Sequence, residues 1–92
     1  MATVSVQVPT LLRKLTGGQD RVEVSGTTVG QSIDNLERTH PGLKYKLCDD
    51  TGNLRRFINI YVNQDDIRFL NDLDTPLNDG DELVIIPAIA GG

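Results

Sequence analysis

The sequence predicts an α+β fold, in which one main helix packs across one face of a mixed β-sheet. Two stretches of alternating apolar and polar residues come first, one amphipathic stretch with a helix-start signal follows, and β-rich stretches come last. A hairpin followed by a helix and further strands is typical of α+β domains, since the apolar face of the sheet needs a helix to cover it.

Period-two alternation predicts the first hairpin. The valines of residues 3–8 fall on one face of a strand that ends at Pro9, and those of residues 21–25 fall on one face of a second strand that ends at Gly26. The connection, residues 10–20, holds three leucines and a Gly-Gly pair. We predict a hairpin loop there whose leucines lie under the sheet.

The helix is predicted from a start signal and a stripe of side chains. Thr28-Val29-Gly30-Gln31 matches a capping box, in which the Thr28 hydroxyl accepts a hydrogen bond from the Gln31 amide while the Gln31 side chain reaches back. One face of the helix is then formed by residues spaced by four, three and four, and Pro41-Gly42 ends the helix. These residues are Val29, Ile33, Leu36 and His40. Leu43 and Leu47, four residues apart, predict one further helical turn.

The second half of the chain predicts the remaining strands. Residues 57–62 form the strongest strand, residues 67–70 a short strand or edge segment, and residues 82–86 the last strand, with Leu73 and Leu77 anchoring the loop before it. If the last strand lies beside the first in parallel, the chain after Pro87 leaves from the edge of the body. The β-grasp fold meets these demands, and we predict a β-grasp domain over residues 1–87 and a flexible tail over residues 88–92.

Composition excludes several classes of function. A chain of 92 residues has little room for a deep catalytic cleft, which favours a carrier or binding role over an enzyme. A single cysteine excludes an intramolecular disulfide and a cysteine-cluster metal site, and we predict no metal site. The net charge of -4 disfavours nucleic acid and membrane surfaces as partners. Because the alternating amino terminus lacks the apolar run of a signal peptide, we expect a cytoplasmic protein.

The tail is the candidate reactive segment. Fully extended, five residues span roughly 17 Å, far enough to place a terminal carboxylate in the active site of a partner. Residues without a large side chain also pass a narrow channel easily. A frayed terminus can have the same composition, and the tail alone does not decide between the two. The tail residues are Ala88, Ile89, Ala90, Gly91 and Gly92.

The order of features at the carboxyl end carries a family resemblance. An Asp79-Gly80-Asp81 turn leads into the last strand, then Pro87, then small residues that end in Gly-Gly. This order resembles the ubiquitin-like sulfur carriers of the ThiS/MoaD family. Residues 8–13, 16–19 and 56–63 are also similar to the cysteine-biosynthesis (CysO-type) branch, so the likeness covers nearly the whole chain.

The resemblance implies that partner enzymes act on the tail. An E1-like, ATP-dependent enzyme would adenylate the Gly92 carboxylate, and sulfur from a donor would displace AMP to leave a thiocarboxylate. Gly91, Ala90, Ile89 and Ala88 would give access to the active site of that enzyme. In the cysteine branch, the sulfur acceptor would be an aminoacrylate on a pyridoxal-phosphate (PLP) cysteine synthase, and a metalloprotease would release the product. The carrier itself would bind no cofactor.

Several alternatives stay open. The sulfur carrier could supply molybdopterin or thiamin synthesis instead, or the activated tail could be conjugated to lysines as a ubiquitin-like protein modifier. A plain β-grasp interaction domain with an incidental Gly-Gly is the third class.

Two other reactive side chains are assigned structural roles. Cys48 adjoins Asp49 and Asp50, whose charges raise the pKa of a thiol, and we predict a small packed residue. His40 has no second histidine or cysteine near it in sequence, and we predict that it complements the end of the helix.

A possible docking surface lies on the sheet face away from the helix. If the helix covers Ile58, Ile60 and Val62, alternation places an apolar set opposite them, and an exposed patch of this kind marks a docking surface. The alternative is that Leu11, Leu12, Leu70 or Leu73 covers the set as a second small core. Arg55, Arg56 and Arg68 are candidates for steering an acidic partner. The set is Phe57, Asn59, Tyr61, Val84 and Ile86.

Overall fold

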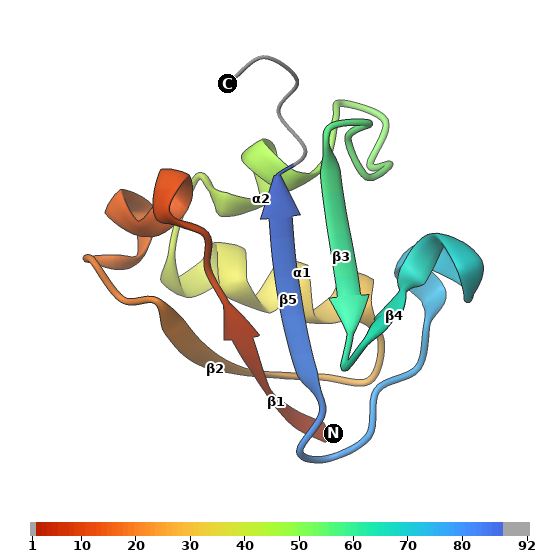
Figure 1. The fold of residues 1–92 in the computed structure, drawn as a ribbon. Helices are drawn as coiled ribbons and strands as arrows, with labels where there is room; N and C mark the ends of the chain where they lie inside the picture. Colours follow the sequence, from red (N-terminus) through yellow and green to blue (C-terminus); the bar gives the residue numbers. More distant parts are fainter. Residues whose placement is uncertain (1, 88–92) are drawn as a thin grey trace.

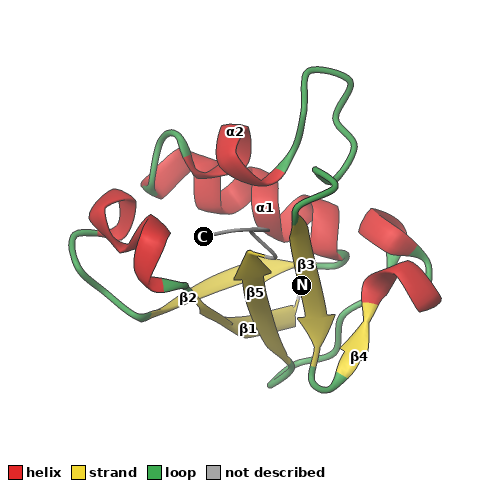
Figure 2. Cartoon of the chain, turned by 45° about the horizontal axis from the view of Figure 1, so that its top comes forward, coloured by secondary structure: helices red, strands yellow, loops and turns green. Residues whose placement is uncertain are grey.

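The computed structural model describes residues 2–87. They form a five-stranded mixed sheet of order β2-β1-β5-β3-β4, with α1 (Val29–Thr39) across one face (Figures 1 and 2). The predicted mixed sheet with one main helix is therefore confirmed. The strands are β1 (Ala2–Gln7), β2 (Arg21–Gly26), β3 (Ile58–Val62), β4 (Asp65–Asp66) and β5 (Glu82–Pro87).

Strands from opposite ends of the sequence meet at the centre of the sheet. β1 and β5 are parallel neighbours, which meets the condition set above for the exit of the chain after Pro87, and Val6 lies opposite Leu83. β2 flanks β1 and β3 flanks β5, both antiparallel, and Ile60 lies opposite Ile85. Because side chains alternate along each strand, these pairs build one apolar face for the helices to cover.

The helices bury the predicted apolar positions. Val29, Ile33 and Leu36 of α1 are at most 2% exposed, and Leu43 and Leu47 of α2 (Leu43–Leu47) are fully buried. Full burial of a side chain of this size stabilises a fold by about 1.5–3 kcal/mol. These five side chains therefore hold both helices against the sheet.

The start of α1 has the predicted capping box. The Gln31 amide donates to the Thr28 hydroxyl at 3.1 Å. The side-chain oxygen of Gln31 accepts from the Thr27 amide at 2.7 Å, so it reaches one residue beyond the cap. The Gln31 amide, which the helix itself leaves without a partner, and the Thr27 amide just before the cap are both satisfied in this way.

A tight turn leads into β5 and ties it to β1. Gly80 has a φ of +89°, a left-handed conformation that favours glycine. The Asp79 carboxylate accepts from the Thr3 amide at 2.8 Å, and the Asp81 carboxylate accepts from the Asn78 amide at 2.8 Å. The Asp-Gly-Asp turn therefore fixes where β5 begins beside its parallel neighbour.

The connection between β1 and β2 corrects one prediction. It is not a loop with every leucine tucked under the sheet but contains a 3-10 helix, η1 (Thr10–Thr16). The Thr16 hydroxyl donates to the Gln19 carbonyl at 2.7 Å and stabilises the end of this helix. Because a 3-10 helix turns every three residues, it carries Leu12 into the core and leaves Leu11 58% exposed.

Residues 67–70 correct a second prediction, because they are not a strand. The short edge strand is β4, and η2 (Ile67–Phe69) follows it. The Asp66 side chain accepts from the Arg68 amide at 2.9 Å, which caps η2 and turns the chain out of the sheet, and Ile67 is fully buried. After η3 (Asp72–Asp74), Leu77 is buried and Leu73 packs against the core, as predicted.

The last described strand, β5, ends at Pro87, one residue later than predicted. The predicted tail, residues 88–92, lies outside the described residues. Within residues 2–87, no helix has the length and apolar character needed to cross a membrane.

Candidate functional site

The candidate site is the carboxyl end of β5, at Pro87. The last pair of the β3–β5 ladder joins Ile58 to Pro87, which has no amide hydrogen to donate. The predicted reactive residue and its access residues begin directly after this pair and lie outside the described residues. They are Gly92, Gly91, Ala90, Ile89 and Ala88.

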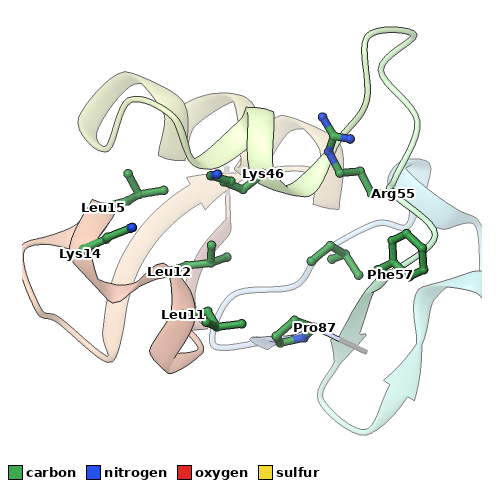
Figure 3. Close-up of a pocket in the computed structure, with 9 residues that line it drawn as sticks. Leu11, Leu12, Lys14, Leu15, Lys46, Arg55, Phe57 and Pro87 are labelled. Atoms are coloured by element: carbon green, nitrogen blue, oxygen red, sulfur yellow. The ribbon is translucent and has the colours of Figure 1, made fainter. Parts of the chain in front are cut away.

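An apolar hollow of about 360 Å³ opens at this exit (Figure 3). It forms where β5 runs further than β1, because pairing with β1 ends at Val84 whereas pairing with β3 continues to Pro87. Side chains from η1, α2 and the start of β3 surround the gap. We call it the exit hollow, and its lining residues are Leu11, Leu12, Lys14, Leu15, Lys46, Arg55, Phe57, Ile58 and Pro87.

Three cations lie at the exit hollow. Lys14 and Lys46 are exposed, and Arg55 is half-buried. The Arg55 Nε donates to the Tyr45 carbonyl at 2.9 Å, and the guanidinium carbon lies 5.1 Å from the centre of the Tyr45 ring, within the range of cation–π attraction. Among residues 2–87, no carboxylate lines the hollow, and the two ion pairs found in this range involve other cations. The exit is therefore a basic spot on an acidic chain.

The sheet face away from α1 is open over β3 and β5. Phe57 is 60% and Ile86 44% exposed, while Tyr61 and Val84 are half-buried and lie opposite each other in the ladder. The second-core alternative is wrong. Of the four leucines proposed as its cover, Leu12 and Leu73 pack with the main core, and Leu11 and Leu70 are exposed. Tyr61, Val84 and Ile86 thus share the open face, whereas Phe57 lies just before β3 and lines the exit hollow, and docking itself stays a prediction.

A family model described as "ThiS family" matches residues 6–92, from within β1 through β5 and beyond. The chain belongs to the ThiS family. The match includes both the described body and the predicted tail.

Similar proteins with names or solved structures agree with this membership. The sulfur carrier protein CysO of Mycobacterium tuberculosis is 48% identical over 91 residues, which cover 97% of this chain and 98% of the relative. In the crystal structure of the Amycolatopsis orientalis BexX/CysO complex, the matching chain has a TM-score of 0.91 and 48% identity, covering 97% of this chain and 99% of that one. The predicted likeness to the CysO-type branch is confirmed.

A modifier protein is also similar. The solution structure of small archaeal modifier protein 1 from Methanosarcina acetivorans has a TM-score of 0.85 and 35% identity, covering 100% of this chain and 98% of that one. The two structural matches confirm the predicted β-grasp fold, since both superpose over nearly the whole chain.

Cys48 and His40 have structural places in this ThiS-family fold. Cys48 is 4% exposed, and its burial is the main cause that raises the pKa of its thiol. The prediction named only the charges of Asp49 and Asp50 as the cause. Asp49, together with Asp34, raises the pKa by less than burial does, Lys44 lowers it, and Asp50 is not among the causes. His40 directly follows α1, and its backbone amide donates to the Leu36 carbonyl at 2.7 Å, while a role of its side chain at the helix end stays a prediction. No cluster of three potential metal ligands occurs between residues 2 and 87.

The arginines predicted to steer a partner differ in their surroundings. The Arg68 guanidinium donates to the Asn59 side chain and, at 2.9 Å, to the Arg55 carbonyl, so it is fixed against the body. Arg56 is exposed, and Arg55 lines the exit hollow. Steering stays a prediction for all three.

Lys14 and Lys46 are the site residues that the sequence did not reveal. Each lies next to a leucine that packs inward, Leu15 in η1 and Leu47 in α2. That neighbourhood is typical of any amphipathic turn, so it does not single out these two lysines. Only the folded chain shows that both lysines reach the same hollow.

Proposed function

We propose that this chain is a sulfur carrier protein, the substrate of partner enzymes and not itself an enzyme. The observation that carries the proposal is its 48% identity to CysO over nearly the full length of both chains. The position of Pro87 supports it, because this last described residue is half-buried, ends the β3–β5 ladder and lines the open exit hollow.

The reactive group of the proposed carrier is the Gly92 carboxylate. A carboxylate is a poor electrophile, and reaction with ATP on an E1-like enzyme would convert it to an acyl adenylate with release of pyrophosphate. A donor sulfur atom would then add to the acyl carbon, AMP would leave, and a thiocarboxylate would remain. Its sulfur is a nucleophile near neutral pH, as thiolates are. Gly91 lacks a Cβ and allows the acyl carbon to approach the enzyme closely.

We place the carrier in cysteine formation in the cytoplasm. The acceptor would be a PLP-dependent cysteine synthase, a metalloprotease would release the product from the tail, and ATP and PLP would be bound by these partners. The likeness to CysO supports this branch over the molybdopterin and thiamin branches. The open face with Phe57, Tyr61, Val84 and Ile86 would dock against a partner, since desolvation of exposed apolar side chains favours association.

Intact-mass spectrometry tests the proposed function. After incubation with ATP, an E1-like enzyme and a sulfur donor, we expect one oxygen of the full chain to be replaced by sulfur, with the change located at Gly92. The matched control lacks Gly92 and ends on the carboxylate of Gly91. Failure of the full chain to gain sulfur, or equal loading of the shortened chain, would contradict the proposal.

A protein modifier is the second candidate, favoured by the likeness to small archaeal modifier protein 1. Both uses begin with the same adenylate, and they differ in the acceptor. Tryptic peptides from cell extracts in which a lysine carries the Gly92 acyl group would support the modifier. A loaded thiocarboxylate without such peptides would support the carrier alone.

A further inference from the structure

We propose that the exit hollow is a recognition site for the activating enzyme. Its occupant is an acidic loop of that enzyme, with one large apolar side chain, at the mouth of the channel that receives the tail. This inference rests on the proposed function and adds the surface and the partner chemistry through which the carrier is selected.

The position of the hollow follows from the reach of the chain. Pro87 lines the exit hollow, and Gly92 is only the fifth residue after it. These residues extend at most roughly 17 Å. An enzyme that holds the Gly92 carboxylate in its active site must therefore bring the entrance of its channel against this end of the body.

The chemistry of the hollow fits an acidic and apolar loop. Leu11 and Phe57 are more than half exposed at its edge, and they favour an apolar side chain between them. Lys14, Lys46 and Arg55 favour carboxylates around that side chain. The contact of Arg55 with Tyr45 already holds the guanidinium in place, so less side-chain freedom is lost on binding.

Charge also makes the hollow selective. The whole chain has a net charge of -4, so most of its surface attracts a basic partner, whereas the exit hollow attracts an acidic one. Complementary charges at an interface increase the association rate and reject wrong partners more than they increase affinity. We therefore expect the three cations of the exit hollow to change the rate at which carrier and enzyme associate, and not the rate of the chemical step.

Kinetics of sulfur loading by the activating enzyme test the site. Lys14→Glu and Lys46→Glu are each compared with Arg38→Glu, which makes the same change of charge on exposed α1 away from the hollow. We expect each hollow variant to raise the KM for the carrier about tenfold at low salt with kcat unchanged, and Arg38→Glu to raise it less than about twofold. Salt should reduce the difference between the variants. Melting temperatures check that all three variants are folded.

Other outcomes would overturn the inference. An equal rise in KM for Arg38→Glu would show that only net charge matters. A defect confined to sulfur transfer from loaded carrier to its acceptor would assign the hollow to the acceptor enzyme. Unchanged KM in both hollow variants would show that nothing acidic binds there. If the unmodified chain is not loaded at all, the proposed function itself fails, which is a different result from loading with an unaltered KM.

Discussion

Gly26, the last residue of β2, lies so close to α1 that no side chain fits between them. A Cβ on Gly26 would lie 2.8 Å from the Ser32 amide nitrogen and would also contact the Ser32 hydroxyl. Ser32 is fully buried, and its hydroxyl has no hydrogen-bond partner among residues 2–87. The contact between Gly26 and Ser32 is therefore one of close packing, and the Ser32 hydroxyl contributes no hydrogen bond to it within residues 2–87.

Gly26→Ala should destabilise the fold by about 1–3 kcal/mol, because the strand or the helix must move to admit a methyl group. Chemical denaturation measures the change, with Ser25→Ala on the exposed side of the same strand as the control. Adding Ser32→Ala should not restore stability, since the backbone nitrogen of residue 32 stays in the way. Full recovery in the double variant would show that only the hydroxyl obstructs the methyl group.

At the scale of elements, one carboxylate joins the two helices. Glu37 of α1 accepts hydrogen bonds from the Gly42 amide at 3.0 Å and the Lys44 amide at 2.9 Å, at the start of α2. The bond from Gly42, followed by that from Lys44, lowers the pKa of Glu37 from its ordinary value of 4.5. The short helix α2 is thus capped by a side chain from the element before it.

The lowered pKa predicts how stability depends on acid. Because the folded pKa lies below the unfolded value of 4.5, the Glu37 contribution is fully present above about pH 4.5 and is lost as pH falls through the folded pKa. Glu37→Gln should melt at a lower temperature than the unmodified chain at pH 7, and the two should converge in acid. Melting curves across this range measure the difference.

The matched control for Glu37→Gln is Glu23→Gln, which removes a carboxylate from the exposed side of β2. Subtracting its curve removes general effects of net charge. Asp49 also has a lowered pKa, chiefly because of the hydrogen bond from the Thr51 side chain. Asp49 is present in every one of these chains, so its acid dependence cancels when their melting curves are compared. A constant difference between Glu37→Gln and the unmodified chain at every pH would contradict the assigned cap.

The elements differ in how far the sequence predicts them. β1, β3, β5 and α1 each have a signal within their own residues. The strands have alternating apolar side chains, such as the valines of residues 3–8, and α1 has the Thr28–Gln31 capping box followed by apolar residues at helical spacing. η1 and η2 have no such period, because a 3-10 turn depends on single hydrogen bonds such as that from Thr16. Leu11 and Leu12, adjacent in sequence, have opposite environments for this reason.

At the scale of the whole molecule, Gly92 should matter for function and not for stability. Glycine has no side chain to bury, and the described core is formed by residues between 2 and 87. Deletion of Gly92 should change the free energy of unfolding by less than about 0.5 kcal/mol while sulfur loading is abolished. Denaturation of the intact and shortened chains checks the first expectation. A large loss of stability would show that the terminus supports the fold.

The reactive end of the candidate site could be predicted from sequence, but the surface around it could not. The order of Asp79-Gly80-Asp81, last strand, Pro87 and Gly-Gly is contiguous, so it is visible in a single segment. The exit hollow combines Lys14, Lys46 and Arg55 from three separate segments. Their meeting depends on where η1 and α2 pack, which no local spacing specifies.

The central place of β5 has a mechanical consequence. A force applied to the carboxyl end of β5 along the strand would load its ladder to β3, from Val62↔Leu83 to Ile58↔Pro87, in shear together with the three pairs that join β5 to β1. Hydrogen bonds loaded together resist force better than bonds opened one at a time. The described body can therefore stay folded while a partner enzyme applies force at the carboxyl end of β5.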